Sequence, residues 1–435
     1  MPYSFLEYDS SLLSDLKTFA SSTASNKDII TTVSSILEEI KAGGDKAVFE
    51  KTKLYDHANL TTAQLKVSID ELSSGFASLS DEELKALNDA QNNIFDFHQQ
   101  SFPHDWTGTN SHGAEFGEKY YPIKRVGLYI PGGNVPLVST VLMTVILAQV
   151  AKVPEIAVVT PPAADGTISP KLLGALQYLG INEVYKVGGA QAIGALAYGT
   201  NLIPSVDKIF GPGNAYVNEA KRQVFGTVGV DLLPGPSEVM VIADETANPE
   251  FVAAALLAQA EHGSGKEKVY FLFTEKYIFQ QTMKELDVQA QKLSHKQSIV
   301  SLLKSGFKAV LVSDLDQIVE VANFIAPEHL ELQVSENHLE ILVKNITTAG
   351  ALLLGHFTAT ALGDFIAGPS HVLPTGRSSR FSSGLRVHDF LRRSSIIKYD
   401  QEAVIKAEEH ISSFAKMERL DGHGASVNIR TKPCR

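Results

Sequence analysis

Apolar and polar positions alternate in two different ways along the middle of the chain. Short apolar runs that end in Gly or Pro predict buried strands, and the segments between them carry apolar residues at helical spacing. The strands of a first series are RVGLYI (125–130), EIAVVTPP (155–162), EVYKVGG (183–189) and VDKIFGPGN (206–214). Repeated strand–helix units of this kind predict a parallel sheet with helices on both faces.

A second series of the same kind starts at SEVMVIAD (237–244) and includes a helix over 251–262. Its other predicted elements are KVYFLF (268–273), KAVLVS (308–313), the helix LDQIVEVANFIA (315–326), HLELQV (329–334) and GALLLG (350–355). The predicted fold class is therefore α/β, with two doubly wound parallel-sheet units.

Helical periodicity also marks both ends of the chain. Residues 28–44 and 80–100 predict helices, and the Gly-, His- and Tyr-rich connector 107–122 predicts irregular or hairpin structure at a domain boundary. Residues 400–427 predict a helix that is followed by a basic tail. This last part is too small to have its own core, so we expect it to pack on another surface, such as that of a partner subunit.

The expected domains follow from these elements. Residues 1–24 form an N-terminal segment, and residues 25–110 join 238–384 in one α/β domain. Residues 111–237 form the other α/β domain, and residues 385–435 form a C-terminal dimerisation segment.

Composition narrows the possible partners and compartments. The chain has 435 residues and a net charge of -11, which argues against a nucleic acid or an anionic membrane as partner. The single cysteine, Cys434, excludes a disulfide framework and a thiolate metal cluster. No signal pattern begins the chain, and the apolar stretch 138–153 is interrupted by polar residues, as in a buried core helix. We expect a cytoplasmic protein that does not bind membranes.

Several polar side chains have the chemistry of metal ligands. Gln259 and His262 lie three residues apart, on one face at the end of a predicted helix, although a capping or core histidine is the simpler interpretation of this motif alone. Asp364 lies in a loop punctuated by Gly and Pro, and His423 follows the C-terminal helix. Together the four would form a nitrogen and oxygen ligand set without sulfur, which suits zinc or another divalent transition metal.

Glu328 and His329 are adjacent and open a predicted strand. Neighbouring residues in a strand point to opposite faces, but at a loop rim both side chains could reach one cleft and act as a general-base pair. A solvated turn is the alternative.

Glycine clusters follow three predicted strands, in YIPGGNVP, VGGAQAIGALAYGT and FGPGNAYV. Main-chain amides exposed there could bind a pyrophosphate, although the G-x-G-x-x-G fingerprint of dinucleotide-binding folds is missing. Tight strand-to-helix turns are the alternative explanation.

The chain resembles the histidinol dehydrogenase family in motifs that have that family's order and spacing over nearly the whole length. These motifs are VGLYIPGG, VGGAQAIGALAYGT, GPGNAYV, GPSEVMVIAD, QAEH, APEHLEL, GDFIAGPSHVLPTG and ERLDGH. The resemblance implies oxidation of L-histidinol to L-histidine with two NAD, the last step of histidine biosynthesis. It also implies one zinc ion per subunit, two incomplete Rossmann-type domains, and a homodimer whose terminal pieces cross over to share active sites.

The resemblance further assigns roles to residues. The implied zinc ligands are Gln259, His262, Asp364 and His423, and the implied catalytic pair is Glu328 and His329. The implied substrate contacts are Ser237, His329, His371 and Glu418, together with the zinc ligands. The implied NAD contacts are Tyr129, Gln191 and Asn214.

This sequence departs from the family pattern at three places. Gly263-Ser264-Gly265 stands where a proline is common, Phe365 where tyrosine is usual, and Arg419 where glycine is common. None of these changes removes a reacting group, but Arg419 adjoins Glu418.

The residues suggest a mechanism as well as alternatives to it. Zinc is redox-inert, so NAD must take the electrons, while His329 accepts the alcohol proton and Glu328 activates water against the aldehyde intermediate. The alternatives are a dehydrogenase of another small alcohol, a zinc hydrolase that leaves the glycine clusters unused, and a binding protein without catalysis.

Overall fold

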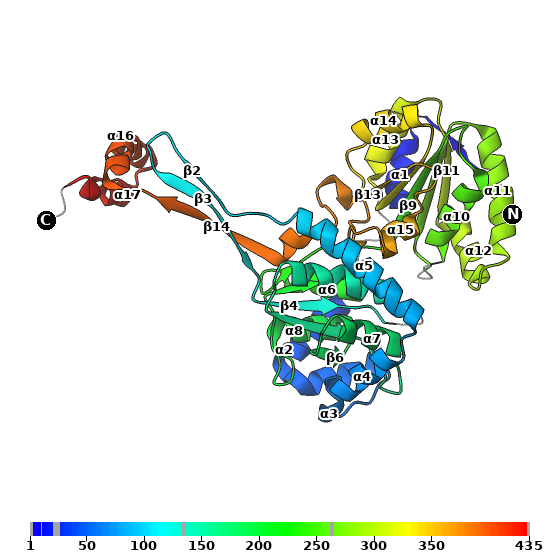
Figure 1. Ribbon diagram of the computed structural model, residues 1–435, viewed down its shortest axis with the longest axis horizontal. Coiled ribbons are helices and arrows are strands. Elements are labelled where there is room, and N and C mark those ends of the chain that lie inside the picture. The colour runs from blue at the N-terminus through cyan, green and yellow to red at the C-terminus, as the bar shows by residue number, and fades with distance from the viewer. Residues whose placement is uncertain (1–2, 10, 21–26, 133–135, 262–264, 433–435) are drawn as a thin grey trace.

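Two parallel sheets, each covered by helices on both faces, form the body of the structure, and a narrow arm projects from that body (Figure 1). The structure is a computed structural model, and it describes residues 3–9, 11–20, 27–132, 136–261 and 265–432. Among the sequence predictions, His262 and Cys434 lie outside the described residues. The predicted α/β class is confirmed.

The first sheet has the strand order β6-β5-β4-β7-β8, and all its strands are parallel. Its strands are β4 (Arg125–Tyr129), β5 (Glu155–Thr160), β6 (Val184–Lys186), β7 (Lys208–Phe210) and β8 (Gly229–Val230). Helices α6 (Val138–Val150) and α7 (Pro170–Tyr178) cover one face, and α8 (Gly189–Tyr198) and α9 (Ala215–Val224) cover the other. The chain crosses from one side of β4 to the other between β6 and β7.

The second sheet repeats this strand order as β11-β10-β9-β12-β13, with β1 (Leu6–Glu7) added beside β11. Its strands are β9 (Glu238–Ala243), β10 (Lys268–Phe273), β11 (Phe307–Leu311), β12 (His329–Gln333) and β13 (Ala351–Leu354). One face carries α10 (Pro249–Ala260), α11 (Lys276–Ala290) and α12 (Lys296–Ser305), and the other carries α1 (Leu12–Ala20), α13 (Leu315–Ile325) and α14 (Glu336–Asn345). A short helix, α15 (Thr360–Phe365), follows β13.

The N-terminal helices pack on the helices that cover the first sheet, so the prediction that residues 25–110 join residues 238–384 is wrong. These helices are α2 (Lys27–Tyr55), α3 (Thr62–Leu65), α4 (Ile69–Ala77) and α5 (Asp81–Gln100). Helix α2 packs on α8 and α9, α4 packs on α7, and α5 packs on α6. Glycines permit the closest of these contacts: a Cβ on Gly75 would lie 2.7 Å from the Cβ of Leu173, and a Cβ on Gly174 would lie 2.7 Å from the Gly75 carbonyl oxygen.

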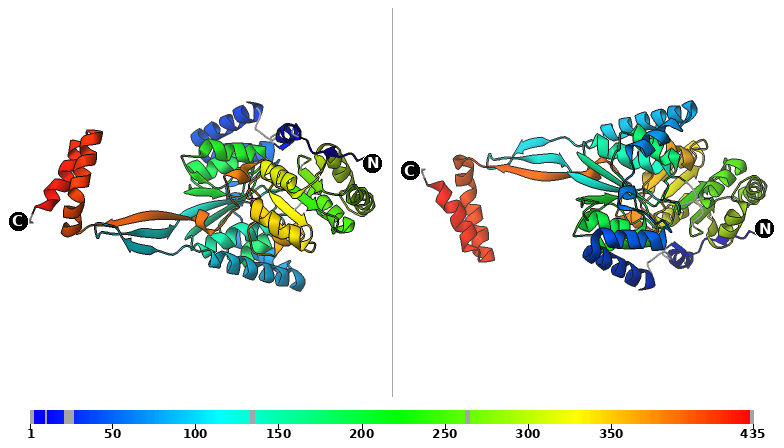
Figure 2. Two further views of the ribbon diagram at one scale, coloured as in Figure 1. Left: turned by 90° about the horizontal axis from the view of Figure 1, so that it is seen from above. Right: turned by 90° about the horizontal axis from the view of Figure 1, so that it is seen from below.

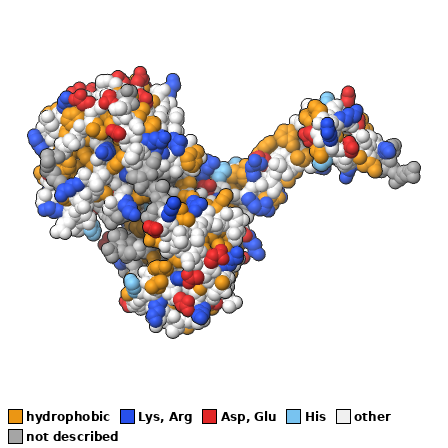
Figure 3. Space-filling view, turned by 180° about the vertical axis from the view of Figure 1, so that it is seen from behind, with side chains coloured by type: hydrophobic (Ala, Val, Ile, Leu, Met, Phe, Trp, Pro, Cys, Tyr) orange, Lys and Arg blue, Asp and Glu red, His pale blue; other side chains and the backbone are white. Residues whose placement is uncertain are grey.

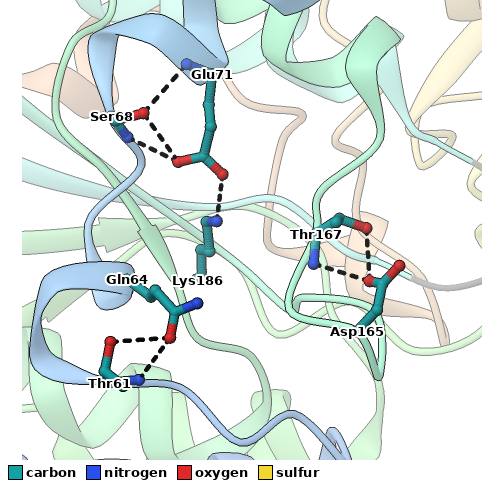
Figure 4. A network of polar contacts seen from close by, with 7 residues as sticks. All are labelled: Thr61, Gln64, Ser68, Glu71, Asp165, Thr167 and Lys186. Carbon is teal, nitrogen blue, oxygen red and sulfur yellow. Dashed lines mark hydrogen bonds and ion pairs between the residues drawn. The ribbon is translucent and has the colours of Figure 1, made fainter.

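Polar contacts fasten the start of α4 to the end of β6 (Figure 4). Lys186, the last residue of β6, forms an ion pair with Glu71. Glu71 also accepts a hydrogen bond from the Ser68 amide at 2.9 Å, which closes a capping box at the N-terminus of α4. The carboxyl end of β6 is therefore joined to a helix from the N-terminal region.

The arm is an antiparallel ribbon that ends in two helices (Figures 1 and 2). Its strands, in the order β14-β3-β2, are β2 (Trp106–Thr109), β3 (Glu115–Pro122) and β14 (Leu391–Lys398), and its helices are α16 (Gln401–Glu418) and α17 (Asp421–Asn428). The hairpin predicted over 107–122 is confirmed. The single helix predicted over 400–427 is wrong, because Arg419 adopts a left-handed conformation with φ 56° and ends α16. Glycine adopts that conformation without strain, which explains why it suits this position better than arginine.

Large apolar side chains remain exposed on the arm (Figure 3). They are Trp106, Phe116, Ile397, Tyr399, Ile405, Phe414, Met417, Leu420 and Ile429, and Ile397 and Met417 are 71% and 70% exposed. An apolar surface of this extent is typical of a surface that another protein covers. Among the described helices, none is long and apolar enough to cross a membrane.

The buried His98 in α5 predicts how the stability of the fold depends on pH. Its ring is 1% exposed and has no hydrogen-bond partner among the described residues, and burial lowers its pKa from 6.5 to about 4. Below pH 6.5 His98 therefore binds a proton in the unfolded chain but not in the folded chain, so the free energy of unfolding decreases as pH falls toward 4. We expect His98→Leu to reduce this loss by about 1.4 kcal/mol per pH unit between pH 6 and 4. Urea denaturation at several pH values would measure it, with exposed His104→Leu as control; parallel pH dependence in wild type and His98→Leu would contradict the prediction.

Candidate active site

The predicted catalytic pair lies at the amino ends of the central strands of the second sheet. His329 is the first residue of β12, Glu328 precedes it, and both side chains are buried. Glu328 Oε2 accepts a hydrogen bond from the Glu238 amide at 2.7 Å, at the start of β9. Because β9 and β12 are paired in parallel, their amino ends bring these residues together.

His329 lies between two carboxylates. Its Nε2 is 3.0 Å from Asp364 Oδ1, and its Nδ1 is 3.8 Å from Glu328 Oε2. The adjacent Glu328 and His329 thus reach one site, as proposed for a loop rim. The solvated-turn alternative is wrong, since Glu328 is 5% exposed and His329 is 6% exposed.

Burial and neighbouring charges shift the pKa of both groups. Burial raises the pKa of the Glu328 carboxyl, and the carboxylates of Glu238 and Asp364 add to that rise. Burial by itself would lower the pKa of His329, but its hydrogen bond to Asp364 and the charges of Glu328 and Asp364 raise that pKa above its usual value. This arrangement can therefore hold a proton on the His329 imidazole.

Glu238 is a buried acid of this site that the sequence analysis did not single out. Burial raises its pKa to about 7, although the charge of Lys268 and a hydrogen bond from the Gly376 amide act to lower that pKa. An acidic residue at the start of an otherwise apolar strand was the available signal. Ser237 precedes it, and its carbonyl accepts a hydrogen bond from the Lys268 amide at 3.1 Å.

His371 links the candidate active site to helix α6, which covers the first sheet. Its Nδ1 is 2.9 Å from the Asp364 carbonyl oxygen, and its Nε2 is 3.3 Å from the hydroxyl of Thr140 in α6. A carbonyl only accepts, so Nδ1 carries a hydrogen, and in the neutral ring Nε2 is then an acceptor. The loop that carries His371 is also fixed to α6 by a hydrogen bond from Ser370 Oγ to the Met143 carbonyl at 3.2 Å.

The predicted metal ligands do not all meet within one chain. Gln259 and Asp364 lie on α10 and α15, which contact each other, and Gln259 Nε2 is buried with no hydrogen-bond partner among the described residues. His423 is exposed on α17, at the end of the arm, with Glu418 at the end of α16 (Figures 1 and 2). His262 lies outside the described residues. Over the described ranges, no three His, Cys, Asp or Glu side chains converge in a metal-binding group.

The chemistry of these side chains nevertheless suits a zinc site in which a second chain supplies the remaining ligands. The buried amide of Gln259 and the carboxylate of Asp364 offer oxygen ligands in the body, while His423 and Glu418 face solvent on the arm. These residues can hold a zinc ion together only if the arm of another subunit reaches the body of this chain.

The three predicted NAD contacts lie at the carboxyl ends of the first sheet. Tyr129 ends β4, Gln191 lies in the first turn of α8 after β6, and Asn214 caps α9 after β7. The Tyr129 hydroxyl accepts a hydrogen bond from the Gly189 amide at 3.2 Å, and Gln191 Nε2 donates to Asp56 Oδ2 at 3.1 Å. Ligands of doubly wound sheets bind at this edge, near the strand where the order reverses.

Two of the three glycine clusters have amides that are already bound within the chain. At α8, the Gly188 amide binds Asp56, whose pKa burial raises to about 6, and the Gly189 amide binds Tyr129. At α9, Asn214 Oδ1 accepts hydrogen bonds from the amides of the next turn at 3.0 and 3.1 Å. These contacts are those of tight strand-to-helix turns, the alternative explanation for the glycine clusters, and they give the amides of Gly188 and Gly189 partners within the chain. The third cluster lies partly in 133–135, outside the described residues.

Sequence and structure comparisons point to one family. The sequence profile of the family described as histidinol dehydrogenase matches residues 20–431. The histidinol dehydrogenases of Halalkalibacterium halodurans and Listeria monocytogenes are 42% and 40% identical to the chain, over 92% and 96% of it and 93% and 96% of their own lengths. The crystal structure of histidinol dehydrogenase from Elizabethkingia anophelis is 36% identical and has a TM-score of 0.93, covering 98% of this chain and 97% of that one.

Proposed function

The chain belongs to the histidinol dehydrogenase family, and we propose that it oxidises L-histidinol to L-histidine through a bound aldehyde, with two NAD and one zinc ion per subunit. It is accordingly an NAD-dependent oxidoreductase of histidine biosynthesis. The observation that supports the proposed chemistry is the buried His329 between the carboxylates of Glu328 and Asp364.

His329 would accept the proton of the substrate alcohol. The two carboxylates beside it stabilise the imidazolium that this transfer creates, and burial keeps bulk water from competing for the proton. Glu328, held by the Glu238 amide, would activate the water that adds to the aldehyde, with His329 relaying a proton. The alcohol would give its first hydride to NAD as the aldehyde forms, and the hydrated aldehyde would give a second hydride to a second NAD and release its hydroxyl protons to become the carboxylate.

Zinc would be held by Gln259, His262 and Asp364 of one chain and by His423 of another. When bound it supplies orientation of the nitrogen-rich substrate and takes no electrons, because it has no redox chemistry. Ser237, His371 and Glu418 would complete substrate binding. NAD would lie at the carboxyl ends of the first sheet, at Tyr129, Gln191 and Asn214.

The arm supports a homodimer with shared active sites. Its exposed apolar side chains need a partner surface, and its helices place His423 and Glu418 away from the body of their own chain (Figure 2). In such a dimer each arm would reach the active site of the other subunit.

Counting NADH per histidinol consumed tests the reaction. A four-electron oxidation yields about two NADH per substrate, because each NAD accepts one hydride. One NADH per substrate, or none, would contradict the proposed reaction, and a panel of other small alcohols would measure substrate selectivity.

Prolonged chelation tests the metal. We expect NADH formation to stop while the circular dichroism spectrum stays near that of the untreated protein, since both sheets have large apolar cores. Added zinc should restore activity. Full activity in protein shown by elemental analysis to be free of metal would refute a zinc requirement.

A further inference from the structure

A buried ion pair lies behind the loop that follows β7. The side chains of Lys221 in α9 and Asp231 after β8 are 0% and 1% exposed, and they pair with each other. Both side chains also bind Gly211. Lys221 Nζ donates to the Gly211 carbonyl at 2.9 Å, and the Gly211 amide donates to Asp231 Oδ2 at 2.7 Å. Opposite charges thus hold both main-chain polar groups of one glycine.

Gly211 is pressed against the end of β4. Its φ is 109°, in a region that favours glycine, and a Cβ at this position would lie 2.1 Å from the Tyr129 carbonyl oxygen. The ion pair therefore fixes the loop 211–214 relative to Tyr129. Asn214, at the other end of this loop, caps α9 through its Oδ1.

A second side chain of α9 ties the same loop to the active-site segment. Asn218 Nδ2 donates to the Gly213 carbonyl at 3.0 Å and also to the Pro234 carbonyl. Pro234 belongs to the stretch 231–237, which starts at Asp231 and leads into Glu238, whose amide binds Glu328. Asn218 thus links the loop 211–214 by hydrogen bonds to the segment that leads into the proposed catalytic site.

A buried ion pair is weak support for stability, because apolar residues of similar size often do as well. This pair also binds both main-chain polar groups of Gly211, which points to a geometric role. We propose that Lys221 and Asp231 are positioning residues for NAD, which set the loop 211–214 against the end of β4. This inference rests on the proposed placement of NAD at Tyr129 and Asn214. Neither residue would touch the cofactor.

Two variants separate positioning from stability. Lys221→Met leaves Asp231 buried without its partner and should lower both stability and NAD affinity. In Lys221→Met/Asp231→Leu no charge is left buried without a partner, so thermal stability should recover part of the loss, the remainder being the cost of the unpaired amide and carbonyl of Gly211. Both hydrogen bonds to Gly211 are lost in this double variant, so the KM for NAD and the Kd from calorimetric titration with NAD should be raised by about 10-fold to 100-fold. The KM for histidinol should change by less than about threefold, which is small beside that loss.

Arg125→Met is the matched control. Arg125 forms ion pairs with Glu155 and Glu183 at the opposite, amino edge of the same sheet, and its side chain is 11% exposed. Its loss should lower stability without changing the Kd for NAD.

Two results would overturn the positioning role. One is a folded double variant that binds NAD as tightly as the wild type. The other is loss of folding in both variants, because the pair would then be a folding element. The proposed function is judged separately, since it fails if the wild-type protein makes no NADH from histidinol, whereas NAD titration needs no turnover.

Discussion

Replacement of His329 by alanine is expected to slow oxidation of both histidinol and its aldehyde, by the ~10²–10⁴-fold that a general base contributes. The imidazole is held by Asp364 at 3.0 Å and lies near Glu328, and no other described histidine occupies this position between two carboxylates. Both half-reactions release a proton from oxygen, so both lose the acceptor. Steady-state rates with each substrate would measure the effect.

Glu328→Gln should separate the two steps. Only oxidation of the aldehyde needs an activated water, so this variant should lose far more activity with the aldehyde than with the alcohol. The amide keeps an oxygen that can accept the hydrogen bond from Glu238, so the local structure should persist.

His338→Ala is the matched control for these variants. His338 also pairs with a buried carboxylate, Asp244, at 2.7 Å, but at the carboxyl end of β9. Its loss should leave both rates nearly unchanged. Equal losses with the two substrates in Glu328→Gln would move water activation to another residue, and near-normal rates in His329→Ala would remove the proposed base.

The sequence predicted the sheets well because their strands are buried on both faces. Runs such as 269–273 are apolar throughout, and all the residues of β9, β10 and β12 are buried. The proposed catalytic pair could also be identified from the sequence, since Glu and His at the start of such a strand stand out. Glu238 carried the same signal in a weaker form, because an acid at a strand start is common on protein surfaces.

The errors have a shared physical cause. An amphipathic helix shows that one face is buried but not against which surface, so the assignment of residues 25–110 could not be derived from periodicity. The close approach of Gly75 to α7 depends on a residue distant in sequence. Strand β14 escaped prediction because both faces of the ribbon are largely exposed, and LRRSSIIK shows no regular alternation.

Mixed dimers give the second large effect, which tests whether the arm completes the partner's site. Gln259→Ala and His423→Ala should each give a nearly inactive pure dimer, because each removes a proposed zinc ligand from every site. If sites are shared, a mixed dimer collects both lesions in one site and none in the other. Random reassortment makes about half of the dimers mixed, so ~25% of wild-type activity should return. NADH production by the unfractionated mixture after subunit exchange would measure this recovery, and two affinity tags would show that mixed dimers had formed.

A second pair of variants makes the result specific to the arm. Gln259 and Asp364 both lie in the body, on α10 and α15, so mixing Gln259→Ala with Asp364→Ala leaves one lesion in every site of the mixed dimer. This pair should recover no activity, whereas the pair of body and arm lesions should recover about a quarter. If His423 instead served its own chain, the two mixtures would behave alike and both would stay inactive despite proven exchange. The separation of α17 from both sheets argues for the first outcome, because an arm held away from its own active site can supply a ligand only to another subunit (Figure 1).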